Sequence, residues 1–254
     1  MLEVTQEQIV NSLDSIGIIQ GDSLLVHSAI QFLGRPVGGV GIYLHAIMDV
    51  IGPLGTLAVP TFNFGFAQGE RYDPENTPAK GMGIFSEYVR KQPNSQRTSH
   101  PMQSLAVIGY HTKDLVTRDT PSAFESGSAF ERILELDFKQ LLLGADISAS
   151  SIFHYSETRN NVPYRYWKDF SGEYKTSEGW QERIYRMFVR DLDLNPVLTA
   201  EPVEELLIKR SQWRSVKLNY GMIVSCSVRD FIAAVDHFLS DDPWSLVTNL
   251  PKNL

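Results

Sequence analysis

The chain has 254 residues, of which 43% are hydrophobic and 21% charged, and it contains a single cysteine, Cys226. Such a chain can form a large core, and one cysteine excludes an internal disulfide or a thiolate metal cluster. The net charge of −7 argues against a general nucleic-acid binder, which would be expected to be basic. No apolar stretch approaches the ~20 residues of a membrane span, and the N-terminus lacks signal-peptide features. We therefore expect a reduced, cytoplasmic protein with no metal, nucleic-acid or membrane partner.

The N-terminal part is predicted to begin with a helix, because Thr5–Gln8 has the form of a capping box. The apolar run Ser23–Ser28 predicts a buried strand, and Val40–Val50 has the pattern of a second helix. Thr56–Phe62 predicts the next strand. Pro60 within it indicates either an edge position or the end of that strand.

Residues 63–81 form a polar stretch that is too long for an ordinary connection and is typical of a functional or disordered loop. A helix over Met82–Lys91, a strand over Leu105–Tyr110, a helix opened by Ser128 and a strand over Gln140–Gly144 are predicted to follow. This alternation of strands and helices predicts an α/β fold with a mainly parallel central sheet that carries helices on its faces.

The last third of the sequence has a different character. The run from Tyr164 to Leu198 is rich in aromatic and charged residues and predicts short antiparallel elements. A helix over Glu201–Arg210, a strand over Ser215–Ser225 and a final helix capped by Ser227 complete the prediction. Because the sequence contains no linker or repeat, we expect a single domain, 1–254, made of a main α/β part, 1–160, and a second subdomain packed against it, 161–254.

The clearest chemical signal is the segment SSIFHYSE, which follows a predicted buried strand and a serine-rich turn. His154 and Glu157 are three residues apart, so a helix would place both side chains on one face. A carboxylate beside an imidazole can accept the Nδ1 proton and leave Nε2 as a base. On spacing alone, an ordinary solvated His/Glu pair is the alternative interpretation.

Two further segments have residues suited to an anion. Arg97, Thr98 and Ser104 belong to a loop that could hold phosphate or could be a polar turn before a strand. After the segment His27–Ile30, Gly34 and the pair Gly38–Gly39 would allow close backbone approach to a ligand near a helix N-terminus. Neither segment matches a strict phosphate-binding motif.

Six segments, in this order, resemble the aminoglycoside 3-N-acetyltransferase family: VHSAI with Gly34 and Gly38–Gly39, GTLAVPTFNF, YDPENTPAKGMGIFSEYVRK, RTSHP with Ser104, LLLGAD and SSIFHYSE. The resemblance runs through nearly the whole chain. It implies a three-layer α/β/α fold with a smaller antiparallel C-terminal portion, distinct from the commoner acetyltransferase superfamily. It also implies acetyl-CoA as donor and a primary amine of an amino sugar or aminocyclitol as acceptor, without a metal.

The resemblance further implies roles for individual residues. His154 would be the general base and Glu157 its orienting carboxylate. Ser151, where the family usually has threonine, would place a hydroxyl near the thioester carbonyl. Coenzyme A is expected between two regions of the chain, with contacts from His27, Ser28, Ala29, Gly38, Gly39, Arg97, Thr98 and Ser104.

The acceptor is less constrained by the sequence. Glu70 and Asp73 in the 63–81 stretch would suit a cationic aminoglycoside, whose amine would attack the thioester directly. Tyr164 and Arg165 begin an aromatic and basic segment that would suit a nucleotide-linked or acidic sugar of surface polysaccharide synthesis. A non-catalytic acyl-CoA-binding protein is the alternative from another class. Acyl chain length and oligomeric state, including a homodimer, are left open.

Overall fold

The computed structural model describes residues 2–249. Its helices are α1 (Gln6–Ser15), α2 (Gly41–Ile51), α3 (Gly83–Arg90), α4 (Thr112–Val116), α5 (Ala129–Glu135), α6 (Phe153–Arg159), α7 (Glu201–Lys209) and α8 (Val228–Asp241). Three short 3-10 turns are η1 (Ile30–Leu33), η2 (Phe66–Gln68) and η3 (Ile147–Ala149). The strands are β1 (Glu3–Val4), β2 (Ser23–Ser28), β3 (Arg35–Pro36), β4 (Thr56–Pro60), β5 (Gln96–Arg97), β6 (Leu105–Gly109), β7 (Lys139–Leu143), β8 (Arg165–Thr176), β9 (Gly179–Arg190), β10 (Arg214–Leu218) and β11 (Gly221–Ser227).

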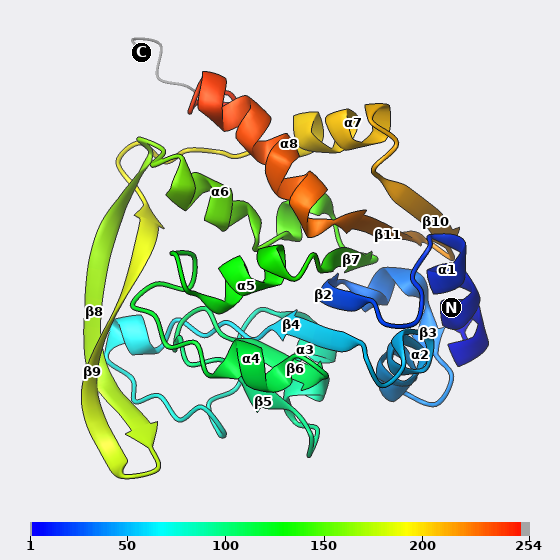
Figure 1. Cartoon of the computed structure of the whole chain (residues 1–254), viewed down its shortest axis with the longest axis horizontal. Helices are drawn as coiled ribbons and strands as arrows, with labels where there is room; N and C mark the ends of the chain where they lie inside the picture. Colours follow the sequence, from blue (N-terminus) through cyan, green and yellow to red (C-terminus); the bar gives the residue numbers. More distant parts are fainter. Residues whose placement is uncertain (1, 250–254) are drawn as a thin grey trace.

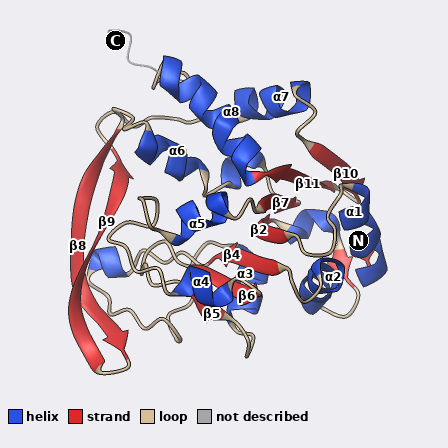
Figure 2. Ribbon diagram, viewed as in Figure 1, coloured by secondary structure: helices blue, strands red, loops and turns tan. Residues whose placement is uncertain are grey.

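A seven-stranded sheet in the order β10-β11-β7-β2-β4-β6-β5 forms the centre of the molecule. Helices lie on both of its faces, and the long β8–β9 hairpin stands at one side, away from the N-terminus (Figure 1; Figure 2). The predicted three-layer α/β/α architecture is thereby confirmed. The parallel pairings join the central strands β7, β2 and β4, whereas the strands outside them pair antiparallel.

Alternate residues of the central strands supply two separate cores. Leu24 and Val26 of β2 pack with α1, α2 and α3, whereas Leu25 packs on the opposite face with α5, α6 and α8. Successive side chains of a strand point to opposite faces, so a strand covered on both sides must be apolar throughout. This explains why the buried strands were recognisable in the sequence as continuous apolar runs.

Two details of the predicted strands are settled by the sheet. Pro60 is the last residue of the interior strand β4, so it marks the end of the strand and not an edge. The single strand predicted over Ser215–Ser225 is wrong, because the segment is the β10–β11 hairpin. Asn219 in its turn has φ 56°, a left-handed conformation that asparagine tolerates better than most residues. Through β11 this hairpin extends the main sheet beside β7.

The β8–β9 hairpin confirms the antiparallel elements expected after Tyr164, although each strand has 12 residues and is not short. It is held to the body of the protein by a third cluster of buried side chains: Phe66, Tyr72, Met102, Tyr174, Tyr185 and Met187. This cluster joins the hairpin to the loop that follows β4. Within residues 2–249, no helix has the length and apolar character needed to cross a membrane.

Candidate active site

A cavity of about 260 Å³ lies beyond the ends of the three central parallel strands. His27 near the end of β2, Pro60 at the end of β4 and the segment Ile147–Ser151 after β7 all line it. The rest of its lining is Phe62, Met82, Phe153, His154 and the segment 198–200. The carboxyl ends of parallel strands are where α/β proteins usually bind ligands, so this cavity is the first candidate for a site.

His154 lines this cavity and is paired with Glu157, which is buried behind the lining residues. Helix α6 places His154 Nδ1 2.5 Å from Oε2 of Glu157, as the spacing of the two residues predicted. The Glu157 side chain has no exposed surface, whereas the His154 side chain is 36% exposed. Burial opposes ionisation of Glu157, but His154 and Arg165 outweigh it and hold the pKa of this carboxyl below its usual value. An ionised carboxylate can only accept, so Nδ1 carries the imidazole proton and Nε2 is left for a molecule in the cavity.

Arg165, at the start of β8, contacts the same pair. Its Nε lies 2.9 Å from Glu157 Oε1, and its Nη2 lies 3.3 Å from His154 Nδ1. The predicted contact of Arg165 with the acceptor is not supported, because the guanidinium is paired with Glu157 inside the protein. Phe124 completes the surroundings by packing edge-on against the His154 ring, with 5.6 Å between the ring centroids.

His27 is bound to Ser151 and does not simply face the cavity. Its Nε2 lies 2.9 Å from both the backbone nitrogen and the Oγ of Ser151. Because a backbone N–H can only donate, Nε2 is an acceptor and the proton of His27 sits on Nδ1. The Ser151 hydroxyl proton is therefore directed to His27, and donation to a thioester oxygen would require the hydroxyl to rotate. His27 thus holds the segment that leads into α6.

The burial of His27 predicts a loss of stability in acid. Burial lowers the pKa of His27 to about 3 in the folded protein, whereas the unfolded side chain titrates near 6.5. The unfolded state therefore binds the extra proton between these values, and stability falls as the pH drops from about 6.5 toward 3. His27→Gln is expected to reduce this slope, measured by urea unfolding at a series of pH values.

A matched control for that measurement is His45→Gln, because His45 is exposed on α2 and should leave the slope unchanged. The buried His100, whose pKa burial lowers to about 4, supplies a second part of the slope in both variants. An identical slope in wild type and His27→Gln would show that His27 does not remain neutral in the folded protein.

The loop containing Arg97 does not offer the predicted phosphate site. Thr98 and Ser104 are buried, with 3% and 0% of their surface exposed. Arg97 donates to Ser104 Oγ at 2.8 Å and to the Thr77 carbonyl at 2.5 Å, and it lies over the Tyr72 ring. These contacts use the guanidinium to tie β5 and β6 to the 63–81 loop. The predicted phosphate contacts of Thr98 and Ser104 are therefore not supported, because both hydroxyls are enclosed. Arg97 is held by protein oxygens, although it also lines the cavity of about 800 Å³ described below.

The other half of the predicted coenzyme A region keeps its accessible backbone. Ser28 and Ala29 are half-buried at the end of β2. They directly follow His27, which lines the His154 cavity. Gly38 and Gly39 are exposed just before α2, with φ values of 100° and 86° that strongly favour glycine. These four residues remain predictions for binding coenzyme A.

The predicted acceptor residues differ in how accessible they are. Glu70 is exposed and lies 3.4 Å from Lys80, so its carboxylate can be reached. Asp73 accepts from Lys175 at 2.8 Å; burial opposes ionisation, but this hydrogen bond helps lower the pKa of Asp73 to about 2. Tyr164 has no exposed surface, and its predicted contact with the acceptor is not supported because the ring lies in the core.

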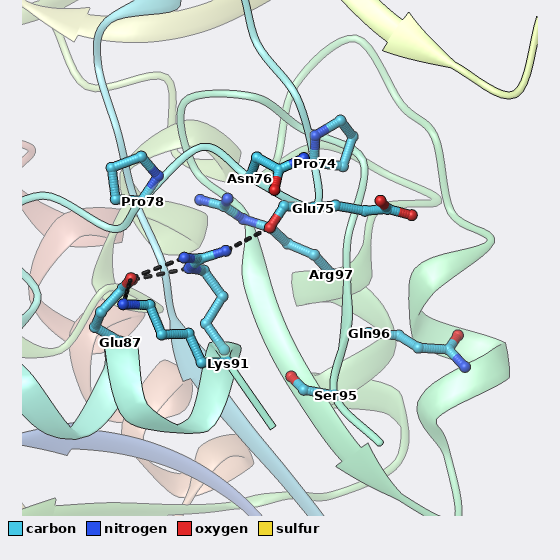
Figure 3. A pocket seen from close by; sticks show the side chains of 10 residues that line it. Pro74, Glu75, Asn76, Pro78, Glu87, Lys91, Ser95, Gln96 and Arg97 are labelled. Carbon is cyan, nitrogen blue, oxygen red and sulfur yellow. Dashed lines mark hydrogen bonds and ion pairs between the residues drawn. The ribbon is translucent and has the colours of Figure 1, made fainter. Parts of the chain in front are cut away.

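A larger cavity of about 800 Å³ lies elsewhere, between the loop 74–78, α3 and the segment 95–97 (Figure 3). It shares no lining residue with the His154 cavity. Arg90 donates to both carboxylate oxygens of Glu87, at 2.7 and 2.8 Å, and to the Glu75 carbonyl. Arg90 and Lys91 are thus paired with Glu87, and no histidine in the described part of the chain lines this cavity as His154 lines the smaller one. Among residues 2–249, no three His, Cys, Asp or Glu side chains are grouped as metal ligands.

Comparison with known proteins decides the family. The sequence model of the aminoglycoside 3-N-acetyltransferases matches residues 25–240. The chain belongs to this family. The predicted family and the predicted class of enzyme, an N-acetyltransferase, are therefore confirmed.

Individual members of the aminoglycoside 3-N-acetyltransferase family are distant relatives. An aminoglycoside N(3)-acetyltransferase III from Salmonella sp is 25% identical over 224 residues, which cover 79% of this chain and 75% of the relative. An aminoglycoside N(3)-acetyltransferase VII from Streptomyces paromomycinus is 28% identical over 210 residues, which cover 75% and 71%. The solved structure of AAC-IIIb in a binary complex with CoASH superposes with a TM-score of 0.85 at 20% identity and covers 98% of this chain and all of that one. The likeness to this structure confirms the fold.

Proposed function

We propose that this chain transfers an acetyl group from acetyl-CoA to a primary amine of an aminoglycoside, with His154 as the general base. The observation that carries the proposal is the contact between His154 Nδ1 and the buried carboxylate of Glu157 at the wall of a cavity. This contact fixes the tautomer and leaves Nε2 as the one ring nitrogen that can take a proton from a substrate.

The chemistry follows from the charge of the acceptor. An alkylammonium has no free electron pair, so a proton must leave before or during attack. The ammonium first loses one proton to solvent and becomes the neutral amine. His154 Nε2 then accepts a second proton from the amine nitrogen as that nitrogen forms a bond to the thioester carbonyl carbon of acetyl-CoA. The carbon–sulfur bond then breaks, and coenzyme A leaves as the thiol after taking up a proton. Glu157 stabilises the imidazolium that exists between the two proton transfers.

Direct attack, without an acyl-enzyme, is supported by the surroundings of Cys226 and Ser151, the two side chains that could otherwise carry the acetyl group. Cys226 is buried in β11, and burial raises the pKa of its thiol well above the usual range. A neutral, buried thiol is a poor acyl carrier. Ser151 has His27 as its partner, but burial keeps that imidazole neutral and makes it a weak base. The acetyl group is therefore best passed straight from sulfur to nitrogen.

An aminoglycoside is favoured as the acceptor over a nucleotide-linked or acidic sugar. Two solved relatives of the same fold contain a gentamicin and sisomicin, respectively. The segment Tyr164–Lys168 was the case for an anionic sugar, and within it Tyr164 is buried and Arg165 is paired with Glu157. Tyr166, Trp167 and Lys168 of the same segment are exposed, so the amine panel described below includes that class of acceptor. The exposed carboxylate of Glu70 suits a polycation.

The proposal is tested by measuring thiol release from acetyl-CoA with a panel of amines. We expect release with aminoglycosides, none with amino-sugar nucleotides, and none without an amine, with the acetylated product identified by mass spectrometry. Release without any amine would instead show thioester hydrolysis. Coenzyme A binding without release for any amine would show a non-catalytic binding protein. Release with the sugar nucleotides alone would show that the acceptor is a nucleotide-linked amino sugar of the kind used in polysaccharide synthesis.

A further inference from the structure

Arg165 takes no part in the proton transfer described above, yet it contacts both His154 and Glu157. The Arg165 side chain is 12% exposed and lies 2.9 Å from a carboxylate with no exposed surface. A third contact, from Nη1 to the Phe188 carbonyl at 3.2 Å, anchors it to β9. We propose that Arg165 is a positioning residue that keeps His154 uncharged in the resting enzyme by balancing the charge of Glu157. The inference rests on the proposed function, because it matters only if His154 must accept a proton.

The Glu157 carboxylate is costly to bury in its ionised form. An ionised side chain without contact to water is stable only when an opposite charge lies beside it. Glu157 has two neighbours that can supply this charge, His154 at Oε2 and Arg165 at Oε1. If the guanidinium were absent, the imidazolium form of His154 would be the only counter-charge. A histidine that already holds its second proton cannot act as a base.

The guanidinium changes this balance because it is always charged. With Arg165 present, the carboxylate is neutralised before any substrate binds, and His154 needs no second proton. The approach of Nη2 to within 3.3 Å of His154 Nδ1 adds a repulsion against imidazolium. In the resting site, Arg165 carries one positive charge and Glu157 one negative charge. The proton from the amine gives His154 its positive charge only during the reaction.

Other titratable groups around the pair do not supply the missing charge. Burial and the nearby carboxylate raise the pKa of Tyr164, so its hydroxyl is neutral, and His27 is neutral as well. On α5, Glu131 accepts from the Tyr155 hydroxyl and the Gly127 backbone. On α8, Asp236 pairs with Arg159. The charge state of His154 is therefore set by Glu157 and Arg165.

The test compares the pH profiles of kcat/KM for wild type, Arg165→Met and Arg165→Lys in the full chain. In Arg165→Met the acid limb of the profile is expected to move toward higher pH by about one unit or more. At pH values below both limbs, activity then falls about tenfold for a one-unit shift, and the loss disappears in alkali. Arg165→Lys, which keeps a positive charge, should keep the limb close to its wild-type position. Arg190→Met is the control, because Arg190 is exposed on β9 directly opposite Arg165 in the strand register.

A second readout does not depend on turnover. The ring nitrogens of His154, followed by NMR with ¹⁵N-labelled histidine and assigned with His154→Ala, should stay protonated to higher pH in Arg165→Met than in wild type. Thermal melting checks that the variants fold, and Arg165→Gln is a second neutral variant if Arg165→Met does not. An equal loss of kcat at every pH, with an unshifted His154 titration, would overturn the inference and leave Arg165 a structural tie.

The two proposals fail in different ways. If His154→Ala keeps full turnover, the base assigned under the proposed function is wrong, whatever the NMR titration shows. If His154→Ala is inactive but neither neutral Arg165 variant shifts the titration or the acid limb, only the role of Arg165 is wrong.

Discussion

Replacing His154 with alanine is expected to lower kcat/KM by about 10²- to 10⁴-fold, the usual contribution of a general base. The reason is that Nδ1 of His154 is held by Glu157, so Nε2 of the same ring is the nitrogen that can take the amine proton. Coenzyme A affinity, measured by isothermal titration, should be largely unchanged. The defect should shrink at alkaline pH, where more of the amine is neutral and solvent hydroxide can take the proton that leaves the attacking nitrogen.

The matched control is His45→Ala, which removes an exposed imidazole from α2 and should leave turnover unchanged. A His154→Ala protein with wild-type turnover, or with a defect that is equal at pH 7 and in alkali, would contradict the assignment of His154 as the base.

Glu157→Gln is expected to cost about 3–5 kcal/mol in the free energy of unfolding, the range for breaking a buried ion pair. The substitution leaves the guanidinium of Arg165 without a counter-charge in a nearly dry site. The pKa of Glu157 is lowered in the folded protein, so its stabilising contribution is present above the unfolded pKa near 4.5 and is lost as the pH falls through the folded value. The difference between variant and wild type, measured by urea unfolding, should therefore be large at pH 7 and smaller in acid.

Two further variants separate the buried charge from other causes. Adding Arg165→Met to Glu157→Gln should recover part of the lost stability, because no unpaired charge is then buried. Asp169→Asn breaks an exposed pair, with side chains 58% and 43% exposed in Asp169 and Arg186, and should cost less than about 1 kcal/mol. A similar cost for Glu157→Gln and Asp169→Asn would show that burial of the pair contributes little.

Features that depend on neighbouring residues were predictable from the sequence. The capping box at Thr5, the caps at Ser128 and Ser227, and the contact of His154 with Glu157 each join residues two or three positions apart. A helix fixes such distances by its own geometry, so the sequence alone contains the information. The buried strands were equally clear, because two-sided burial leaves a continuous apolar run.

Features that depend on the tertiary fold were missed or misassigned. His27 contacts Ser151 across 124 positions of sequence, and no local pattern indicates this. Arg165 was assigned to the acceptor from its basic surroundings, but the turn after α6 brings it back onto Glu157. Arg97 was assigned to phosphate because a guanidinium among hydroxyls suits an anion, whereas in the fold backbone carbonyls take its donors. Residue type indicated which groups are polar, and only the packing shows where each is directed.

The order of strands in the sheet has a consequence for how the protein is made. β7 leads directly into the segment that lines the cavity, and its free edge is covered by β11, the last strand among the described residues. A nascent chain that has not yet released residues 221–227 from the ribosome therefore carries an exposed strand edge next to the future catalytic centre. Such edges attract other chains, and pairings between distant segments form slowly. Chains cut short before β11 should consequently aggregate and be degraded, so translation must pass Ser227 before any activity can appear.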